Sequence, residues 1–196
     1  MARLTRVEQQ RQTHERLLGA ARTVFAKRGF LATTVDEIAA EAGYTRGAVY
    51  KHFGGKEGLW LAIVDAQAEA HLEMLDEALA QATDQPGLVR ALTPTTIADD
   101  GTRWGVEAAE FVAAVAGRPD TAAEIVAAQR RHEEQIAAVL DRHCRRLGLR
   151  PALPLPDVVV LLGAAAGGLI LRRGMDPEVD AAAIVAGLLA VVFPEG

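Results

Sequence analysis

Apolar residues recur at spacings of three and four along almost the whole chain, and no segment alternates apolar with polar residues. The first spacing is typical of helices with one buried face, whereas alternation would indicate half-buried strands. Proline and glycine divide the pattern into segments of helical length. The chain is therefore predicted to be all-α, with helices near residues 8–28, 35–42, 46–53, 55–82, 87–97, 102–117, 120–147, 157–173 and 178–192.

Residues that commonly cap helices mark the ends of the first two segments. Gly29 predicts a left-handed helix end, after which Phe30 can fold back onto Phe25. Thr34, followed three residues later by Glu37, forms a capping box and predicts the start of the second helix. The second helix is therefore expected to begin directly after the first one ends.

The third predicted helix, residues 46–53, is short and has a polar outer face. Gly43 stops the helix before it, and Thr45 is a suitable N-cap for the new one. Two short helices joined by a glycine turn form a helix-turn-helix, whose second helix lies in the major groove of DNA. The inward positions are Ala48, Val49 and Phe53, and the outward positions are Arg46, Gly47, Tyr50, Lys51 and His52.

The outward residue types suit the surface of a DNA duplex. Arg46 can form two hydrogen bonds with a guanine edge, Lys51 can reach another base or a phosphate, and Gly47 allows close backbone approach. Hydroxyl groups, ring tips and helix N-termini favour phosphate oxygens. The predicted phosphate contacts are Thr33, Thr34, Thr45, Tyr50, His52 and Lys56. Each residue also has an alternative role that does not involve DNA. Tyr50 can cover the core of the head, and Lys51 and His52 can be ordinary solvated residues. Thr34 can serve only as a helix cap, and Gly47 only in the turn.

Charge is divided unevenly along the sequence. Residues 1–56 hold ten Lys and Arg against five Asp and Glu, whereas residues 57–196 hold eleven against twenty-one. A basic head on an acidic body indicates that the head alone meets a polyanion, although chance segregation is the alternative. We therefore expect a DNA-binding domain over residues 1–56 and a helical ligand-binding and dimerisation domain over residues 57–196.

Residues 13–60 resemble the DNA-binding domain of the tetracycline-repressor (TetR-like) family of bacterial regulators. The resemblance rests on three segments in family order and spacing: AARTVFAKRGF, TTVDEIAAEAG and GAVYKHFGGKEGL. It implies a homeodomain-like head of three helices, and Arg46, Gly47 and Lys51 close to bases. It further implies a homodimer that leaves an inverted-repeat operator on double-stranded DNA when a small molecule binds the body. Many relatives have serine at the position of Gly55, so a phosphate contact is lost there.

Repression is the common mode of the family. A DNA-binding activator, or an architectural protein without a ligand switch, remains the alternative for this chain.

The predicted body gives weaker signals. Its few aromatic residues favour a mostly aliphatic pocket and an apolar or weakly polar ligand, with core packing as the alternative for each lining residue. His132 and His143 can be pocket residues or satisfied histidines at an interface. The pocket candidates are His71, Met74, Trp104, Phe111 and His132, and the dimer-interface candidates are Gly163, Gly167 and Leu171, for which packing within one chain is equally open.

Other functions find little support in the sequence. A single cysteine, Cys144, excludes an internal disulfide, and the apolar run from Val158 to Leu171 is shorter than the roughly 20 residues of a membrane span. The segment GGKEG lacks the Ser or Thr of a phosphate-binding loop, and HExxH, GxSxG and CxxC are absent. We expect a cytoplasmic protein without enzyme activity, metal, cofactor or membrane partner. Lipid binding by the basic first helix is a further alternative.

Overall fold

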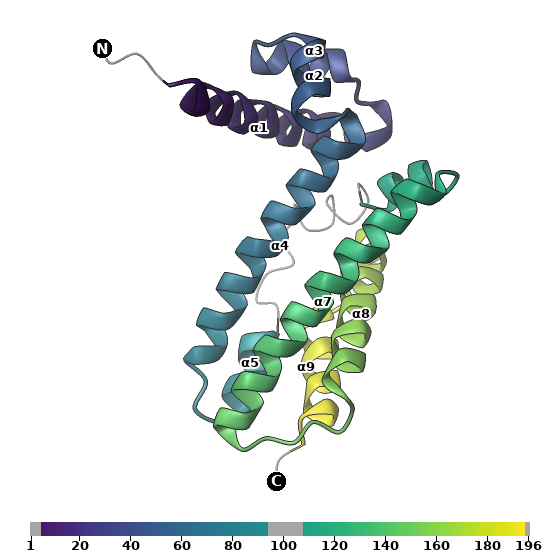
Figure 1. Cartoon of the computed structure of the whole chain (residues 1–196). Helices are drawn as coiled ribbons and strands as arrows, with labels where there is room; N and C mark the ends of the chain where they lie inside the picture. Colours follow the sequence, from purple (N-terminus) through teal and green to yellow (C-terminus); the bar gives the residue numbers. More distant parts are fainter. Residues whose placement is uncertain (1–4, 94–107, 195–196) are drawn as a thin grey trace. The chain divides into compact units, whose positions relative to one another are not determined.

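Every regular element within residues 5–93 and 108–194, the part that the computed structural model describes, is a helix (Figure 1). These described ranges contain no strand, so the all-α prediction is confirmed. The helices are α1 (Arg6–Ala32), α2 (Val35–Ala42), α3 (Arg46–Phe53), α4 (Lys56–Ala80), α5 (Gln85–Leu92), α7 (Pro119–Leu147), α8 (Leu155–Met175) and α9 (Ala181–Val192), and residues 108–115 are also helical.

The chain forms two compact units. The first contains Met1–Gln67 and Glu107–Pro119, and the second contains Ala68–Val106 and Asp120–Gly196. The division falls inside α4 and gives the first unit more of the chain than residues 1–56. The boundary of a DNA-binding domain at residue 56 stays a prediction.

The first unit is built on a kink in α1. Gly29 has φ +76°, as its predicted role requires, but the chain turns back into helix and α1 ends only at Ala32. The rings of Phe25 and Phe30 lie 5.5 Å apart, and both lie 5.5 Å from the ring of Trp60. Phe111 joins this cluster at 4.9 Å from Phe30. The kink therefore brings aromatic side chains from before and after it into one core.

Hydrogen bonds at both ends of α2 agree with the sequence prediction. Thr34 Oγ1 accepts a hydrogen bond from the Glu37 amide, and Glu37 Oε2 accepts one from the Thr34 amide, which completes the capping box. The helix ends at Gly43 in the left-handed conformation (φ +71°). α2 is thus fixed at each end by local chemistry.

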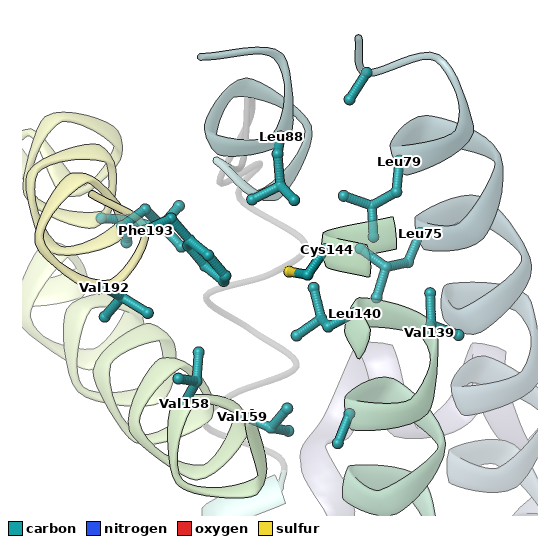
Figure 2. Close-up of a cluster of buried hydrophobic side chains, with 14 residues drawn as sticks. Leu75, Leu79, Leu88, Val139, Leu140, Cys144, Val158, Val159, Val192 and Phe193 are labelled. Atoms are coloured by element: carbon teal, nitrogen blue, oxygen red, sulfur yellow. The ribbon is translucent and has the colours of Figure 1, made fainter. Parts of the chain in front are cut away.

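The second unit is held by one aliphatic cluster (Figure 2). It includes Leu75 and Leu79 of α4, Leu140 and Cys144 of α7, and the C-terminal Phe193, with further residues from α5, α8 and α9. Buried aliphatic side chains in close contact provide most of the stability of such a bundle.

His143 crosses from α7 to α4 beside this cluster. Its Nε2 lies 2.6 Å from Asp76 Oδ1, and its Nδ1 lies 3.3 Å from the Arg146 guanidinium. Because Arg146 can only donate, Nδ1 accepts and Nε2 carries the proton. His143 is therefore satisfied by partners within its own chain, and a position at an interface stays a prediction.

One described helix, α8, is long and apolar enough to span a bilayer by length and composition. It extends at both ends beyond the fourteen-residue apolar run of the sequence. Only 11 % of the most apolar 18-residue stretch of α8 is buried. α8 therefore carries more exposed apolar surface than a core helix of a soluble protein does.

Candidate nucleic-acid interface and ligand pocket

Helix α3 is fixed to the first unit by a few residues and presents the rest to solvent. Val49 is fully buried, while Arg46, Gly47, Tyr50 and Lys51 are exposed. Thr45 occupies the N-cap position without forming a side-chain capping bond. A helix of eight residues with one fully buried side chain has its outer face available to another molecule.

The end of α3 is positioned by glycines. Gly54 ends the helix with φ +73°. A Cβ atom on Gly58, in the first turn of α4, would lie 1.8 Å from the Phe53 carbonyl oxygen, so no larger residue fits without a backbone shift. This close approach fixes α3 against the start of α4. The sequence analysis missed Gly58, because only the packed backbone shows the contact.

Arg46 and Tyr50 form a pair on the outer face of α3. The Arg46 guanidinium donates a 3.2 Å hydrogen bond to the Tyr50 hydroxyl and lies 5.4 Å from the centre of its ring. It also lies 3.5 Å from the Asp36 carboxylate. These exposed contacts hold the guanidinium extended over α3 and are weak enough to be exchanged for a base or phosphate.

Lys51 and His52 border a hollow of about 350 Å³ between α3 and the N-terminal part of α1. His14 stacks on Phe53 at 4.4 Å and lies 6.2 Å from the His52 ring. Burial lowers the pKa of His52, and the nearby His14 and Lys51 add to this effect. At neutral pH the His52 imidazole is therefore mainly uncharged, and its phosphate contact stays a prediction.

Three α1 residues besides His14 complete the hollow, namely Val7, Gln10 and Arg11, and sequence reasoning missed all four. Gln10 and Arg11 precede His14 by one helical turn, so they share its face. The sequence shows the spacing of these residues, but it does not show that they lie close to α3.

Two of the predicted phosphate contacts have other roles. Thr33 is 2 % exposed, and its hydroxyl donates a 2.7 Å hydrogen bond to the Gly29 carbonyl, so this side chain is turned away from solvent. The ammonium of Lys56 donates to the carbonyls of Phe30 and Thr33, at 2.9 Å each, and burial lowers its pKa. Both side chains therefore satisfy the backbone after the α1 kink, and no phosphate contact is needed to explain them.

Thr34 remains exposed while it caps α2. Its hydroxyl already donates to Glu37 Oε2 at 2.9 Å, and hydrogen bonds from Thr34 lower the pKa of the Glu37 carboxyl. Capping is thus its established contact, and a phosphate contact stays a prediction.

The second unit contains a cavity of about 460 Å³. His71 and His132, both predicted as pocket residues, line it, and their ring centres lie 5.8 Å apart. The Nδ1 atom of His132 is buried and has no hydrogen-bond partner among the described residues. The other lining residues are Leu75, Ala91, Leu92, Gln129, Glu133, Ile136, Leu140, Val159, Leu162, Gly163, Ala166 and Val185.

Three other pocket predictions have different outcomes. Met74 is 63 % exposed because it lies on the outer side of α4, and it does not line the cavity. Phe111 is 3 % exposed in the aromatic core of the first unit, so that assignment was wrong as well. Trp104 lies outside the described residues.

The predicted dimer residues lie on α8. Gly163 lines the cavity, and a Cβ atom on Gly163 or Gly167 would meet nothing within 4 Å. Gly167 and Leu171 are among the exposed, mainly apolar positions of α8 and α9 that we together call the α8–α9 face. Its members recur at helical spacing and are Val160, Ala164, Gly167, Leu171, Met175, Ile184, Gly187 and Val191.

Residues 17–63 match the family described as bacterial regulatory proteins, tetR family. The regulator TtgR of Pseudomonas putida is 44 % identical over 71 residues, which are 36 % of this chain and 33 % of TtgR. The match thus spans about a third of the length of that relative.

Similarity of fold extends much further along the chain. A TetR-family transcriptional regulator from Pectobacterium atrosepticum has a TM-score of 0.63 at 25 % identity, over 98 % of this chain and 99 % of the other. A SmeT–triclosan complex has a TM-score of 0.60 at 23 % identity, over 93 % and 92 % of the two chains.

A helix-turn-helix with an exposed basic recognition helix, placed before a helical bundle, defines the class of DNA-binding regulators. Residues 17–63 thus match the tetR family of bacterial regulatory proteins, and the fold of the whole chain is similar to that of a TetR-family regulator.

Proposed function

We propose that the protein is a homodimeric, sequence-specific DNA-binding repressor that leaves its operator when a small, mostly apolar molecule binds the second unit. The observation that carries this proposal is the outer face of α3, where exposed Arg46, Gly47, Tyr50 and Lys51 surround a single buried anchor, Val49. An activator that uses the same α3 face is the alternative.

The α3 face has the chemistry of major-groove readout. Arg46 precedes Lys51 by five residues, so both can reach one groove from the first and second turns of the helix. Gly47 adds no side chain between them and permits close approach of the backbone. Tyr50, His52, Thr34 and Thr45 supply polar groups for the flanking phosphates.

A second copy of the chain is the occupant that best fits the α8–α9 face. The opposite side of α8 packs into the aliphatic cluster through Val158 and Val159, and it also borders the cavity. α8 is thus part of a bundle with one apolar face left uncovered. The glycine at position 167 leaves room for a partner helix, and an isologous contact would relate the two α3 helices by one two-fold axis. A dimer of this kind reads an inverted repeat.

The cavity supports a ligand-controlled switch. Its volume of about 460 Å³ and its mainly apolar lining suit a small organic molecule, and SmeT, which has a similar fold, forms a complex with triclosan. α4 begins beside Gly55, which has φ +141°, and also carries His71 and Leu75 of the cavity lining. A ligand that favours one position of α4 would change the separation of the two α3 helices. The protein is expected to act in the cytoplasm.

Selection of bound duplexes from a random DNA pool, at a fixed salt concentration near 150 mM, tests this function. The wild-type protein is expected to enrich an inverted repeat with half-sites about one or more helical turns apart. Arg46→Ala should weaken binding by roughly 1–3 kcal/mol and relax the preference at one base of each half-site. The control is to extract the purified protein and show that no small molecule is bound to it. If that protein enriches no sequence, the proposal is refuted.

A further inference from the structure

The buried Nδ1 of His132 is the polar feature of the cavity that the fold leaves unexplained. His143, eleven residues later on α7, uses both ring nitrogens in hydrogen bonds within the protein. His132 lines the cavity, and its Nδ1 has no partner among the described residues. A buried polar atom without a partner costs free energy, and a ligand that supplies the partner recovers it.

The charges around the cavity restrict the kind of ligand. No Lys or Arg occurs among the described lining residues, so an anionic ligand would have no fixed counter-ion. The one lining carboxylate, Glu133, accepts a 2.9 Å hydrogen bond from the Gln129 amide. Burial lowers the pKa of His132, the adjacent His71 adds to this effect and Glu133 opposes it, so the neutral ring offers no counter-charge to a ligand carboxylate. An ammonium ion would have Glu133 as a counter-charge but would lose its hydration among the aliphatic lining residues.

A neutral imidazole has one N–H group and one lone pair, and either can lie at Nδ1. A hydroxyl group can donate to the lone pair or accept from the N–H, whereas an ether or ketone can only accept. The remaining lining is mainly aliphatic and favours a hydrocarbon or aromatic body.

We propose that the effector is an uncharged, mainly apolar molecule with a hydroxyl group, a phenol or an alcohol, that forms a hydrogen bond with His132 Nδ1. This inference rests on the proposed ligand-responsive function and specifies the chemistry of its cavity. His132 thus selects the ligand, while His71, which is exposed, borders the cavity from α4.

The test measures binding of four probes of nearly equal shape to the full-length protein at pH 7 without DNA. The probes are 2-naphthol, naphthalene, 2-naphthoate and 2-naphthylmethylammonium. We expect 2-naphthol to bind about tenfold more tightly than naphthalene, and more tightly than either charged probe. Tighter binding of a charged probe, or equal binding of naphthol and naphthalene, would overturn the proposal.

Two variants separate the hydrogen bond from the shape of the cavity. His132→Phe keeps a planar ring and should bind naphthalene as well as the wild type does, with the preference for naphthol lost. His71→Phe is the matched control and should keep that preference. A naphthol preference that survives His132→Phe would also overturn the proposal.

A third measurement does not depend on a variant. In wild-type protein with ¹⁵N-labelled histidine, 2-naphthol should shift one imidazole nitrogen resonance that naphthalene leaves unchanged. No such shift, despite naphthol binding, would count against the hydrogen bond. Because these measurements omit DNA, a failure of the operator selection would leave their outcome intact, and the two proposals fail separately.

Discussion

The two units expose surfaces of opposite chemical character. In the first unit, α3 turns Arg46, Tyr50 and Lys51 toward solvent and buries Val49. In the second unit, the α8–α9 face turns apolar residues such as Leu171 and Met175 toward solvent. A cationic face is stable in water and gains from a polyanion, whereas an apolar face gains free energy only when it is covered.

The difference separates reversible recognition from assembly. Charged contacts with DNA weaken with salt and can be released by a small change in geometry. In the proposed dimer, apolar burial between two copies would depend less on salt than the DNA contacts do and would keep the pair together through that change. The proposed function thus assigns a releasable contact to α3 and a lasting one to the α8–α9 face.

A charge on the apolar face should give the largest effect. Gly167→Glu introduces a carboxylate where the chain itself leaves open space, so the fold of one copy should tolerate it. In a dimer interface the uncompensated charge should cost roughly 3–5 kcal/mol. Sedimentation velocity should show dissociation of this variant at concentrations where Gly19→Glu, another open helical glycine, still forms dimers. An undisturbed dimer would remove the α8–α9 face from the interface.

A methyl group at two glycines should separate folding from DNA contact. Gly58→Ala forces a Cβ against the Phe53 carbonyl and should lower the free energy of unfolding by about 1–3 kcal/mol. Gly47→Ala meets no protein atom closer than 3.7 Å, so stability should hold or rise while DNA affinity falls. Chemical denaturation and DNA titration of both variants measure the two effects. Unchanged DNA affinity for Gly47→Ala would show that the backbone of α3 does not approach the duplex.

Substitution of Lys51 and of Lys56 tests which of the two lysines contacts DNA. Lys51→Met should reduce the slope of log K against log salt by about 0.9 for each bound chain, the amount for one phosphate contact. Lys56→Met should leave that slope unchanged and instead lower thermal stability, because its ammonium satisfies backbone carbonyls. The slope is measured by DNA titration at several salt concentrations. A reduced slope for Lys56→Met would restore the phosphate contact predicted from the sequence.

The smallest effect concerns Asp76 in the second unit. Hydrogen bonds from His143 and then Arg142 lower the pKa of its carboxyl. The associated stability is therefore present above the ordinary carboxyl pKa of about 3.9 and is lost as the pH falls through the lower value in the folded protein. In the Asp76→Asn variant the free energy of unfolding should fall less steeply at acid pH than in the wild type. Asp65→Asn, at an exposed position on the same helix, should leave this dependence unchanged. An identical dependence for both variants would contradict this role.

Local signals were sufficient for the helix-turn-helix. The Thr34 capping box, the glycine turn at Gly43 and the end of α3 after Phe53 depend on neighbouring residues, so the sequence predicts them closely. The roles of Thr33 and Lys56 were not predictable in this way. Their partners depend on the kink at Gly29, which brings the carbonyls of residues 29–33 within reach of both side chains.

The cavity shows the opposite case. His71 and His132 were predicted as lining residues from their type, but the pocket also needs α5, α8 and α9, which no local pattern assembles. Phe111 was misassigned because an aromatic residue fits a core and a pocket equally well. Only the packing of Phe30 and Trp60 around it identifies the core.

The most direct test measures DNA binding that depends on both the α3 face and the α8–α9 face. The selected duplex is compared with one in which about half a helical turn of extra DNA separates the half-sites. If the α8–α9 face holds two α3 helices together, a dimer of two 20.8 kDa chains binds the first duplex as one unit, and the insertion weakens binding strongly because only one half-site can be engaged. Equal binding of both duplexes, or one chain per duplex, would contradict the account.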